Sequence, residues 1–381
     1  MASEIIQPQT FDAAAAELAQ ATAQSGAVRI AGAGSKRGWG APGREPDIEL
    51  RTTRLNRIVE HNAGDLTARL EAGVTLAAAQ STFAHAGQTL SLDPPSAPDG
   101  TEPTIGGILA TGDCGPLRHR YGAPRELVLG ITVALSDGTI AQAGGRVIKN
   151  VAGYDLGRLF AGSFGTLGLI LAVNVRLHPL HDGAVTTAAA ASDPAQLVTA
   201  ATALAAAPLE LDALDVRWAG GSGRLLARCT GAEAVRRARR AARILSDHGC
   251  ADLELIDDDE PLWAAQRAGQ RSADGAVVRV AARPSALAEV IEAARAGGGE
   301  LVGRAALGES FVRIAPEALS TLRERLPSQS RAVVLDGPAQ LRAQHDPWDG
   351  TEGPELELMR RVKTRFDPSG TCNPGVFVGG I

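Results

Sequence analysis

The sequence predicts an α+β protein, in which short strands and glycine-rich loops occupy about the first 180 residues. The chain has 381 residues, of which 44 are glycine and 44% are hydrophobic. Composition changes around residues 179–183, and beyond that point strands and helices are expected in the order β-α-β-β-α-β, twice over. This order is typical of a split βαβ, or ferredoxin-like, unit. A chain of this length can bury more than one core.

The first half of the chain alternates short apolar runs with glycine. An alanine-rich helix is expected over 11–24, capped by Thr10 or Asp12 and ended by Gly26. A strand over 27–31 leads into the first glycine loop, and Ser136-Asp137-Gly138 is expected to be the turn between the last two strands. The further strands are predicted over 47–50, 57–60, 66–71, 127–135 and 167–177, with a helix over 76–86 and a proline-rich loop over 93–98.

The second half yields the repeated pattern. Its first copy has predicted strands over 184–190, 213–218, 224–229 and 252–256, with helices over 194–206 and 232–248. The second copy has strands over 276–281, 300–305, 310–314 and 331–335, with helices over 285–296 and 316–325. A last helix over 354–366 precedes the tail. Three parts are therefore expected: residues 1–180, residues 184–340, and residues 341–381 returning to the first part.

The net charge and the spacing of the cysteines argue against several classes of function. The formal net charge of −5 argues against nucleic acid or an anionic membrane as the main partner. The four cysteines are far apart and form no CxxC pair, so they do not describe an iron–sulfur or zinc site. The segment before Thr10 has no basic n-region, and the run 167–173 is too short to cross a bilayer. A cytoplasmic protein is expected.

The first glycine loop, Gly32-Ala33-Gly34-Ser35, follows a strand, as a dinucleotide-binding fingerprint would. Its third glycine, Gly38, comes one residue late, and residues 39–43 cannot open the helix that such a fingerprint needs. A plain tight turn and an anion-binding loop of backbone amides are both compatible with the loop alone. Similar loops at 104–107, 112–115, 149–155 and 165–168 favour the second interpretation and predict a long, phosphate-bearing cofactor.

These loops, in this order, resemble the PCMH-type FAD domain of the vanillyl-alcohol-oxidase superfamily. The similar segments are Leu70–Leu76, Thr104–Gly107 with Ala110, Tyr121-Gly122, Asp137-Gly138, Gly144-Gly145, Lys149–Asp155 and Gly162–Ile170. The resemblance covers about residues 5–180, and the Asn-Pro-Gly tail is a further family feature. The string Gly145–Leu156 is similar, more narrowly, to the FAD-binding E subunits of bacterial glycolate oxidases.

The resemblance implies a set of cofactor-binding residues for non-covalent FAD. Lys149 would stabilise negative charge on a reduced flavin, although a surface lysine is the alternative. No histidine lies beside the Gly32 loop, and Cys114 is better explained as a small buried cysteine than as a flavin thioether. The implied residues are Gly32, Ala33, Gly34 and Ser35 at the pyrophosphate, Thr104, Ile105, Gly106, Gly107, Gly112 and Gly115 along the ribityl–diphosphate arm, Gly165, Thr166, Gly168 and Ile170 at the ring system, together with Lys149, Asn150 and Asn373.

The second half lacks a motif that the resemblance would lead one to expect. Catalytic 2-hydroxy-acid dehydrogenases of the superfamily carry a histidine-rich strand turn that supplies metal ligands and a base. The corresponding stretch here, Val302–Phe311, has the glycines but no histidine. His178 and His181 flank Pro179, which favours a linker over a metal site. Catalytic residues are therefore not assigned, and no metal is expected.

Two charged runs have alternative interpretations. Asp257–Glu260 precedes Pro261, which suits an acidic cluster at a helix N-terminus, with a cation site as the weaker reading. Five arginines lie on a helix whose other face carries Val235, Ala238, Ala242 and Leu245. They indicate a solvated helix face or a docking surface for an acidic partner. The arginines are Arg236, Arg237, Arg239, Arg240 and Arg243.

The resemblance implies a flavoprotein subunit of a complex that oxidises glycolate or D-lactate. A sister FAD-linked catalytic subunit and an iron–sulfur subunit would be its partners, and any membrane contact, at the inner membrane, would be indirect. The missing histidines and the absence of cluster-binding cysteines favour a subunit. Two alternatives stay open: a stand-alone FAD-dependent 2-hydroxy-acid dehydrogenase that uses another base, and a flavin-free assembly subunit.

Overall fold

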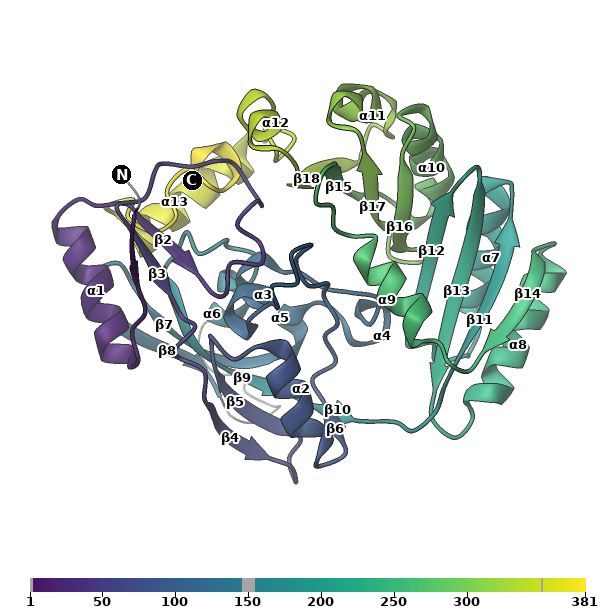
Figure 1. Cartoon of the computed structure of the whole chain (residues 1–381), viewed down its shortest axis with the longest axis horizontal. Coiled ribbons are helices and arrows are strands. Elements are labelled where there is room, and N and C mark those ends of the chain that lie inside the picture. Colours follow the sequence, from purple (N-terminus) through teal and green to yellow (C-terminus); the bar gives the residue numbers. More distant parts are fainter. Residues whose placement is uncertain (1–2, 146–154, 351) are drawn as a thin grey trace. The chain divides into compact units, whose positions relative to one another are not determined.

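The chain divides into two compact units (Figure 1). The computed structural model describes residues 3–145, 155–350 and 352–381. The first unit comprises Met1–Cys114, Gly122–Leu180 and Gly350–Ile381, and the second comprises Gly115–Tyr121 and His181–Asp349. The sequence did not anticipate that residues 115–121 and 341–349 belong to the second unit. Within the described ranges, no helix is both long and apolar enough to span a bilayer.

The first unit contains two main sheets that share a core with helix α1. The three-stranded sheet is parallel, in the order β1-β3-β2, and the five-stranded sheet is antiparallel, in the order β4-β5-β9-β7-β8. Leu18 of α1 packs among Leu50 and Leu169, one from each sheet. The strands are β1 (Glu4–Ile6), β2 (Val28–Ala31), β3 (Ile48–Arg51), β4 (Ile58–Asn62), β5 (Thr67–Glu71), β7 (Val128–Ala134), β8 (Ile140–Gly144) and β9 (Leu169–Arg176), and a small pair is formed by β6 (Gln88–Thr89) and β10 (His178–Pro179).

Helix boundaries in this unit follow the capping residues. The hydroxyl of Thr10 accepts a hydrogen bond from the Ala13 amide and starts α1 (Phe11–Ala23), as predicted. Thr75 caps α2 (Leu76–Ala84) in the same way. The other helices of the unit are α3 (Ile105–Thr111), α5 (Pro124–Leu127), α6 (Leu156–Phe160), and α13 (Pro354–Phe366), whose bounds are those predicted.

The structure corrects two expectations for the glycine-rich zone. The turn at 136–138 joins β7 to β8, a strand that the sequence analysis missed, and β9 pairs with the other side of β7. Residues 104–107 were expected to be a loop, but Thr104 caps α3 and the helix begins at Ile105. A Cβ on Gly106 would lie 2.7 Å from the Ala72 Cβ, so the packing of this helix requires glycine at that position.

The second unit is built on one antiparallel sheet of eight strands, in the order β14-β11-β13-β12-β16-β17-β15-β18. The order of elements along the chain, strand-helix-strand-strand-helix-strand, occurs twice, and the two halves of the sheet meet where β12 pairs with β16. The strands are β11 (Ala184–Ala191), β12 (Ala213–Ala219), β13 (Ser222–Thr230), β14 (Ala251–Ile256), β15 (Ala276–Ala281), β16 (Glu300–Arg304), β17 (Glu309–Ile314) and β18 (Arg331–Asp336). The helices are α4 (Arg118–Tyr121), α7 (Pro194–Ala206), α8 (Ala234–Asp247), α9 (Glu260–Ala268), α10 (Leu287–Ala296), α11 (Leu319–Arg325) and α12 (Ala339–Gln344).

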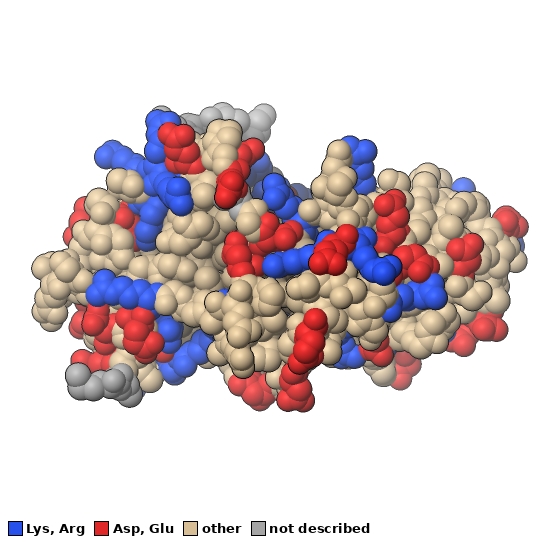
Figure 2. Space-filling view, turned by 90° about the horizontal axis from the view of Figure 1, so that it is seen from above, with Lys and Arg blue, Asp and Glu red and all other residues tan. Residues whose placement is uncertain are grey.

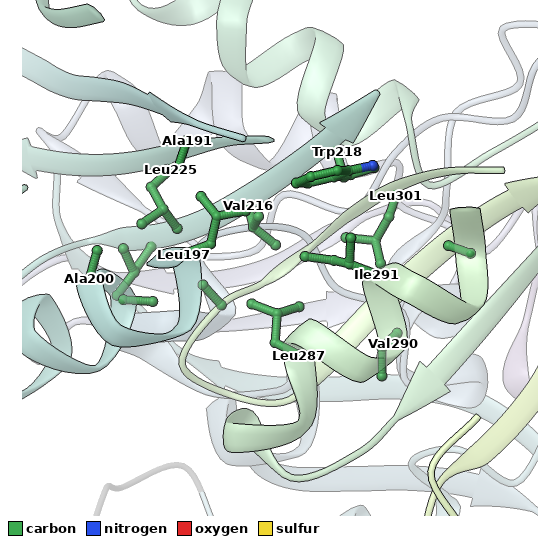
Figure 3. Close-up of a cluster of buried hydrophobic side chains, with 14 of the residues drawn as sticks. Ala191, Leu197, Ala200, Val216, Trp218, Leu225, Leu287, Val290, Ile291 and Leu301 are labelled. Atoms are coloured by element: carbon green, nitrogen blue, oxygen red, sulfur yellow. The ribbon is translucent and has the colours of Figure 1, made fainter. Parts of the chain in front are cut away.

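One face of this sheet forms the core of the second unit. Leu197 of α7 and Ile291 of α10 lie over the centre of the sheet, close to Trp218 at the end of β12 (Figure 3). All three side chains are at most 1% exposed. Alternate residues of a strand point to opposite faces of the sheet, so only every second side chain of a strand can contact these helices.

The opposite face of the same sheet carries a buried ion pair. Arg304 Nη1 lies 3.0 Å from Asp215 Oδ2, and both side chains are fully buried. Gln266 of α9 donates to the same carboxylate oxygen at 2.9 Å, and Arg304 Nε donates to the Gly115 carbonyl at 3.1 Å. A buried charge without its partner is costly, so these contacts depend on one another.

Asp215→Ala should therefore destabilise the second unit strongly. Removing the carboxylate leaves the Arg304 guanidinium buried without its counter-charge, and a loss of about 3–5 kcal/mol in unfolding free energy is expected. Urea denaturation followed by circular dichroism measures the effect. Glu254→Ala is the matched control because Glu254 forms an exposed pair with Arg224, and it should change stability by less than about 1 kcal/mol. Equal effects of the two substitutions would contradict the assignment.

Candidate functional site

The first unit contains a cleft of about 980 Å³ that is open to solvent. Its wall is formed by the end of β2, the loop that follows, the start of α3, residues 164–170 and the C-terminal tail. The residues that line it are Arg29, Ile30, Ala31, Gly32, Ala33, Gly34, Ser35, Lys36, Arg37, Trp39, Ala41, Pro42, Thr52, Ala72, Thr104, Gly106, Gly107, Ala110, Thr111, Phe164, Gly165, Gly168, Leu169, Ile170, Asn373 and Val376.

The cleft brings together most of the residues that the sequence singled out. Those that line it are Gly32, Ala33, Gly34, Ser35, Thr104, Gly106, Gly107, Gly165, Gly168, Ile170 and Asn373. Four others do not line it: Ile105 is buried, Gly112 ends α3 in a left-handed conformation, Thr166 hydrogen-bonds to the Ser163 carbonyl, and Gly115 belongs to the second unit. Lys149, Asn150 and Tyr154 lie outside the described residues.

Two of the glycines are required by packing of the cleft wall itself. A Cβ on Gly32 would lie 2.1 Å from the Thr104 hydroxyl, and one on Gly165 would lie 2.7 Å from Asn373 Nδ2. Gly165 also has a φ of +72°, a left-handed conformation that other residues adopt at a cost. The sequence analysis explained these glycines by the approach of an anion to the backbone. The structure adds a second reason, because Gly32 lets its loop approach the start of α3, and Gly165 lets its loop approach the C-terminal tail.

Asn373 joins those segments. Its Oδ1 accepts a hydrogen bond from the Ile30 amide at 2.7 Å, and its Nδ2 donates to the Phe164 carbonyl at 2.6 Å. The backbone of the tail runs parallel to β2, with the Val28 amide bonded to the Thr371 carbonyl and the Asn373 amide to the Val28 carbonyl. The tail thus acts as a short extra strand beside β2.

Helix α13 anchors the tail from the other side. Lys363 Nζ donates to the carbonyls of Thr166 and Cys372 at 2.8 and 2.9 Å and forms an ion pair with Asp367 at 2.6 Å. Asp367 in turn accepts hydrogen bonds from the Thr371 and Cys372 amides. Burial, followed by the Asp367 charge, raises the pKa of the Cys372 thiol, so this cysteine stays protonated and acts as a small apolar residue.

Cationic side chains dominate the charge of the cleft. Arg29, Lys36 and Arg37 line it, and no carboxylate is among the described residues that do. Lys36 is held by buried Asp113 at 3.1 Å, and Arg37 pairs with buried Glu49, which also binds Arg51. Burial, with the nearby charges of Arg51 and Arg29, lowers the pKa of Arg37, but a guanidinium remains charged near neutral pH.

Several lining residues escaped the sequence analysis. Trp39, Phe164 and Val376 supply apolar surface, and Arg29 and Arg37 supply charge. Arg37 stood inside a motif that was analysed for its glycines, and Val376 follows the recognised tail. Arg29 had no sequence signal, because a single arginine in a strand is ordinary.

The second unit places the histidine-free stretch 302–311 on the hairpin of β16 and β17. Arg304 is buried there against Asp215, and Glu309 forms an ion pair with Arg118 at 2.7 Å. In the part of the chain that the structure describes, no cluster of histidine, cysteine and carboxylate side chains is arranged to hold a metal ion.

The acidic run before Pro261 lies at a helix N-terminus, as expected, because Asp259 is the residue before α9. The structure adds that the Asp259 side chain is buried and pairs with Arg228 at 2.9 Å. It also accepts a hydrogen bond from Thr186 at 2.8 Å. Asp259 therefore fastens the start of α9 to the sheet.

Comparison with known proteins defines the class. Residues 2–144 match the FAD binding domain family. This region is similar to the FAD-binding domains of the PCMH-type, vanillyl-alcohol-oxidase superfamily, and FAD is the cofactor of the chain. The chain is an FAD-dependent oxidoreductase related to glycolate oxidase subunits and to D-lactate and 2-hydroxyglutarate dehydrogenases.

Individual relatives match to different extents. An uncharacterized FAD-linked oxidoreductase of Mycobacterium tuberculosis is 26% identical over 96% of this chain and 88% of its own. Glycolate oxidase subunit GlcE of Escherichia coli is 35% identical over 42% of this chain and 45% of its own, and D-lactate dehydrogenase of Archaeoglobus fulgidus is 34% identical over 46% and 38%. A solved alkyldihydroxyacetonephosphate synthase shares the fold, with a TM-score of 0.70 at 15% identity, over 97% of this chain and 76% of its own.

The cleft fits this cofactor on its own chemistry. FAD combines an anionic diphosphate with a large apolar ring system, and when bound it supplies the electron-accepting centre. The loop 32–36 offers backbone amides without bulky side chains, and the cationic lining without a described carboxylate suits a diphosphate. Phe164, Leu169, Ile170 and Val376 supply apolar surface in the same cleft.

Gly32→Ala should reduce FAD retention sharply. The new methyl group would collide with Thr104 and push the loop away from α3, so we expect at least a tenfold weaker apparent affinity, or about 1.4 kcal/mol. Flavin absorbance per protein after gel filtration measures retention. Gly38→Ala is the control, because no atom lies within 4 Å of its Cβ position, and it should retain FAD normally. The prediction fails if both variants retain FAD alike.

Asn373→Ala should loosen the cleft without removing any predicted pyrophosphate contact. It breaks the side-chain bonds to Ile30 and Phe164, each worth about 0.5–1.5 kcal/mol. We expect faster proteolysis of the tail and several-fold weaker flavin retention. Limited proteolysis with mass spectrometry, beside flavin fluorescence, measures both. Unchanged tail protection would show that Asn373 does not fasten the tail.

Proposed function

We propose that the chain is the FAD-binding subunit of a multi-subunit complex that oxidises glycolate, or D-lactate, to the 2-oxo acid. The observation that carries this proposal is a cleft suited to FAD combined with a β16–β17 hairpin that offers no histidine. Arg304, a charged side chain on this hairpin, is buried in an ion pair with Asp215 and is therefore not available as a base. The chain would hold and relay electrons through FAD, and a partner would take the substrate proton.

The residues of the cleft have assigned roles in this proposal. The amides of Gly32–Ser35 bind the pyrophosphate, and residues 104–107 follow the ribityl–diphosphate arm. Gly165, Gly168 and Ile170 lie against the ring system. Asn373 is a positioning residue, because its side chain fastens the tail to β2 and to residue 164. Lys149 and Asn150 stay predicted contributors, with Lys149 next to the reduced flavin.

The second unit is the cap of this flavoprotein in the proposal. The mirrored strand order on the two sides of the β12–β16 pair supports its interpretation as two ferredoxin-like units. The partners are a sister FAD-linked catalytic subunit and an iron–sulfur subunit. A cytoplasmic complex that is peripheral at the inner membrane through its partners fits an acidic chain of net charge −5. On the face drawn in Figure 2, acidic and basic side chains are interspersed.

A stand-alone 2-hydroxy-acid dehydrogenase is the second candidate. The Mycobacterium tuberculosis relative matches almost all of this chain and most of its own length, and its name mentions no subunit. Such an enzyme would need another base. Among the described side chains, His119 is half-buried and its pKa is lowered by desolvation, so it is neutral near pH 7. His119 belongs to the second unit.

An anaerobic titration separates the two candidates. The purified chain should be yellow with bound FAD, and glycolate or D-lactate alone should leave its absorbance near 450 nm unchanged over about an hour, against turnover of about 1–10³ per second for a competent enzyme. Addition of the sister FAD-linked and iron–sulfur subunits should permit bleaching. Rapid bleaching of the isolated chain would favour the stand-alone enzyme, and a colourless chain that assembles with partners would favour a flavin-free subunit.

A further inference from the structure

The two outer edges of the eight-stranded sheet differ, and the difference identifies a surface that the proposed function leaves unused. β18 forms one edge and β14 the other, and they occupy equivalent positions in the two halves of the sheet. Figure 1 shows β14 at the margin of the second unit, with α8 beside it. An edge strand presents unpaired backbone amides and carbonyls, which other chains can bind.

The β18 edge is closed by the chain itself. The Val334 amide donates to the Pro347 carbonyl at 2.8 Å, and the Ala332 amide donates to the Asp349 carboxylate at 3.1 Å. Arg323 holds this segment by donating to the Asp346 carbonyl at 2.8 Å. The Pro347 carbonyl and the Asp349 carboxylate therefore occupy the outward-facing amides of Val334 and Ala332, so these amides are not available to a further strand.

The β14 edge is open over its described length. Five of its six residues, Ala251–Leu255, are exposed, and within the described chain its backbone bonds only to β11. Leu253 and Leu255 are 39% and 43% exposed. Leu255 pairs with Thr187, whose side chain faces α8, so the two leucines lie on the α8 face of the strand. Exposed leucines on an unpaired edge favour a partner over solvent.

Helix α8 adds charge beside this edge. The Arg237 guanidinium donates hydrogen bonds to the carbonyls of Leu209 and Thr230. Because Thr230 is the last residue of β13, the side of α8 that carries Arg237 faces β13. At 100° per residue, Val235 and Arg239 lie on the opposite flank, beside β14. Val235 is 47% exposed, which differs from its expected place on the buried face, and Arg239 and Arg243 form no ion pair with a described residue.

We propose that the β14 edge is a docking surface for an extended segment of another protein, which adds as a ninth strand. The segment carries acidic and apolar side chains on the face directed toward α8, where they meet Arg239, Val235 and the two leucines. Polar side chains face the other way, toward Glu254 and Arg224. Main-chain hydrogen bonds supply affinity in such strand addition, and alternate side chains supply specificity.

A second copy of this chain is a poorer occupant of the edge. Antiparallel pairing of two β14 strands about a two-fold axis perpendicular to the sheet keeps both α8 helices on one face. Arg239 and Arg243 would then face the same arginines of the other copy, and Glu254 would face acidic residues. Like charges across an interface disfavour that pairing. The proposal does not depend on the cofactor or on the proposed function.

Peptide probes test the surface on the full-length chain. The probe is a labelled peptide of about nine residues with glutamate and valine at odd positions and threonine at even ones, a length that spans a typical strand. A second probe has lysine in place of glutamate, and a third has the first composition in shuffled order. Fluorescence anisotropy should show the glutamate probe binding at least about tenfold more tightly than either other probe.

Protein variants locate the binding on β14. Leu253→Ser with Leu255→Ser should weaken the glutamate probe at least about tenfold, and Arg239→Glu with Arg243→Glu should reverse the preference between the glutamate and lysine probes. Leu358→Ser on α13 and Arg325→Glu on α11 are matched exposed controls and should bind normally. Circular dichroism and thermal unfolding confirm that each variant is folded.

Three results would overturn the proposal. The first is no binding of the glutamate probe up to about 1 mM, where even weak strand addition is detectable. The second is equal binding of the glutamate, lysine and shuffled probes. The third is a concentration-dependent dimer in analytical ultracentrifugation that the two leucine substitutions abolish, because it would assign the edge to a second copy.

Discussion

The first unit depends on the side-chain amide of Asn373, which connects three segments that are more than a hundred residues apart. Oδ1 and Nδ2 bond β2 and residue 164 simultaneously, and Lys363 and Asp367 hold the adjoining tail. The cleft wall consists of these segments, so its shape requires the tail to be in place. Small residues are needed where the segments converge, and this requirement accounts for Gly165 and Gly32 before any ligand is considered.

Buried carboxylates pair with basic side chains in both units of the protein. Two cationic side chains that line the cleft are paired with buried carboxylates, Lys36 with Asp113 and Arg37 with Glu49. Such pairing fixes the long side chains and limits the cost of desolvating them. In the second unit, Arg304 and Arg228 are paired so completely with Asp215 and Asp259 that they are structural. On α8, Arg236 has only the exposed carboxylate of Glu233 as its partner, and Arg239 and Arg243 form no ion pair with a described residue.

The sequence predicted the bounds of a helix or strand correctly where residues within that one segment determine them. The helices at 194–206 and 354–366 and the strand at 276–281 have the predicted bounds, because apolar periodicity and the proline at each helix start act within one segment. It failed at β8 and at α3. The run 140–144 has little apolar pattern and becomes a strand by pairing with β7. The glycines of α3 suggest a loop, yet a helix forms there and Thr104 caps its first turn. Gly106 is needed inside the helix because a larger residue would collide with Ala72.

The sequence by itself indicated the cofactor class, because the order of its glycine loops and its Asn-Pro-Gly tail resembles that of a known FAD domain. It also determined that 302–311 lacks histidine. Only the tertiary structure decided which loop residues share the cleft, that residues 115–121 belong to the second unit, and that Arg304 is buried in an ion pair. It alone showed that β18 is closed and β14 open. These properties arise from contacts between segments distant in sequence, and no local pattern of residues encodes which distant segments will meet.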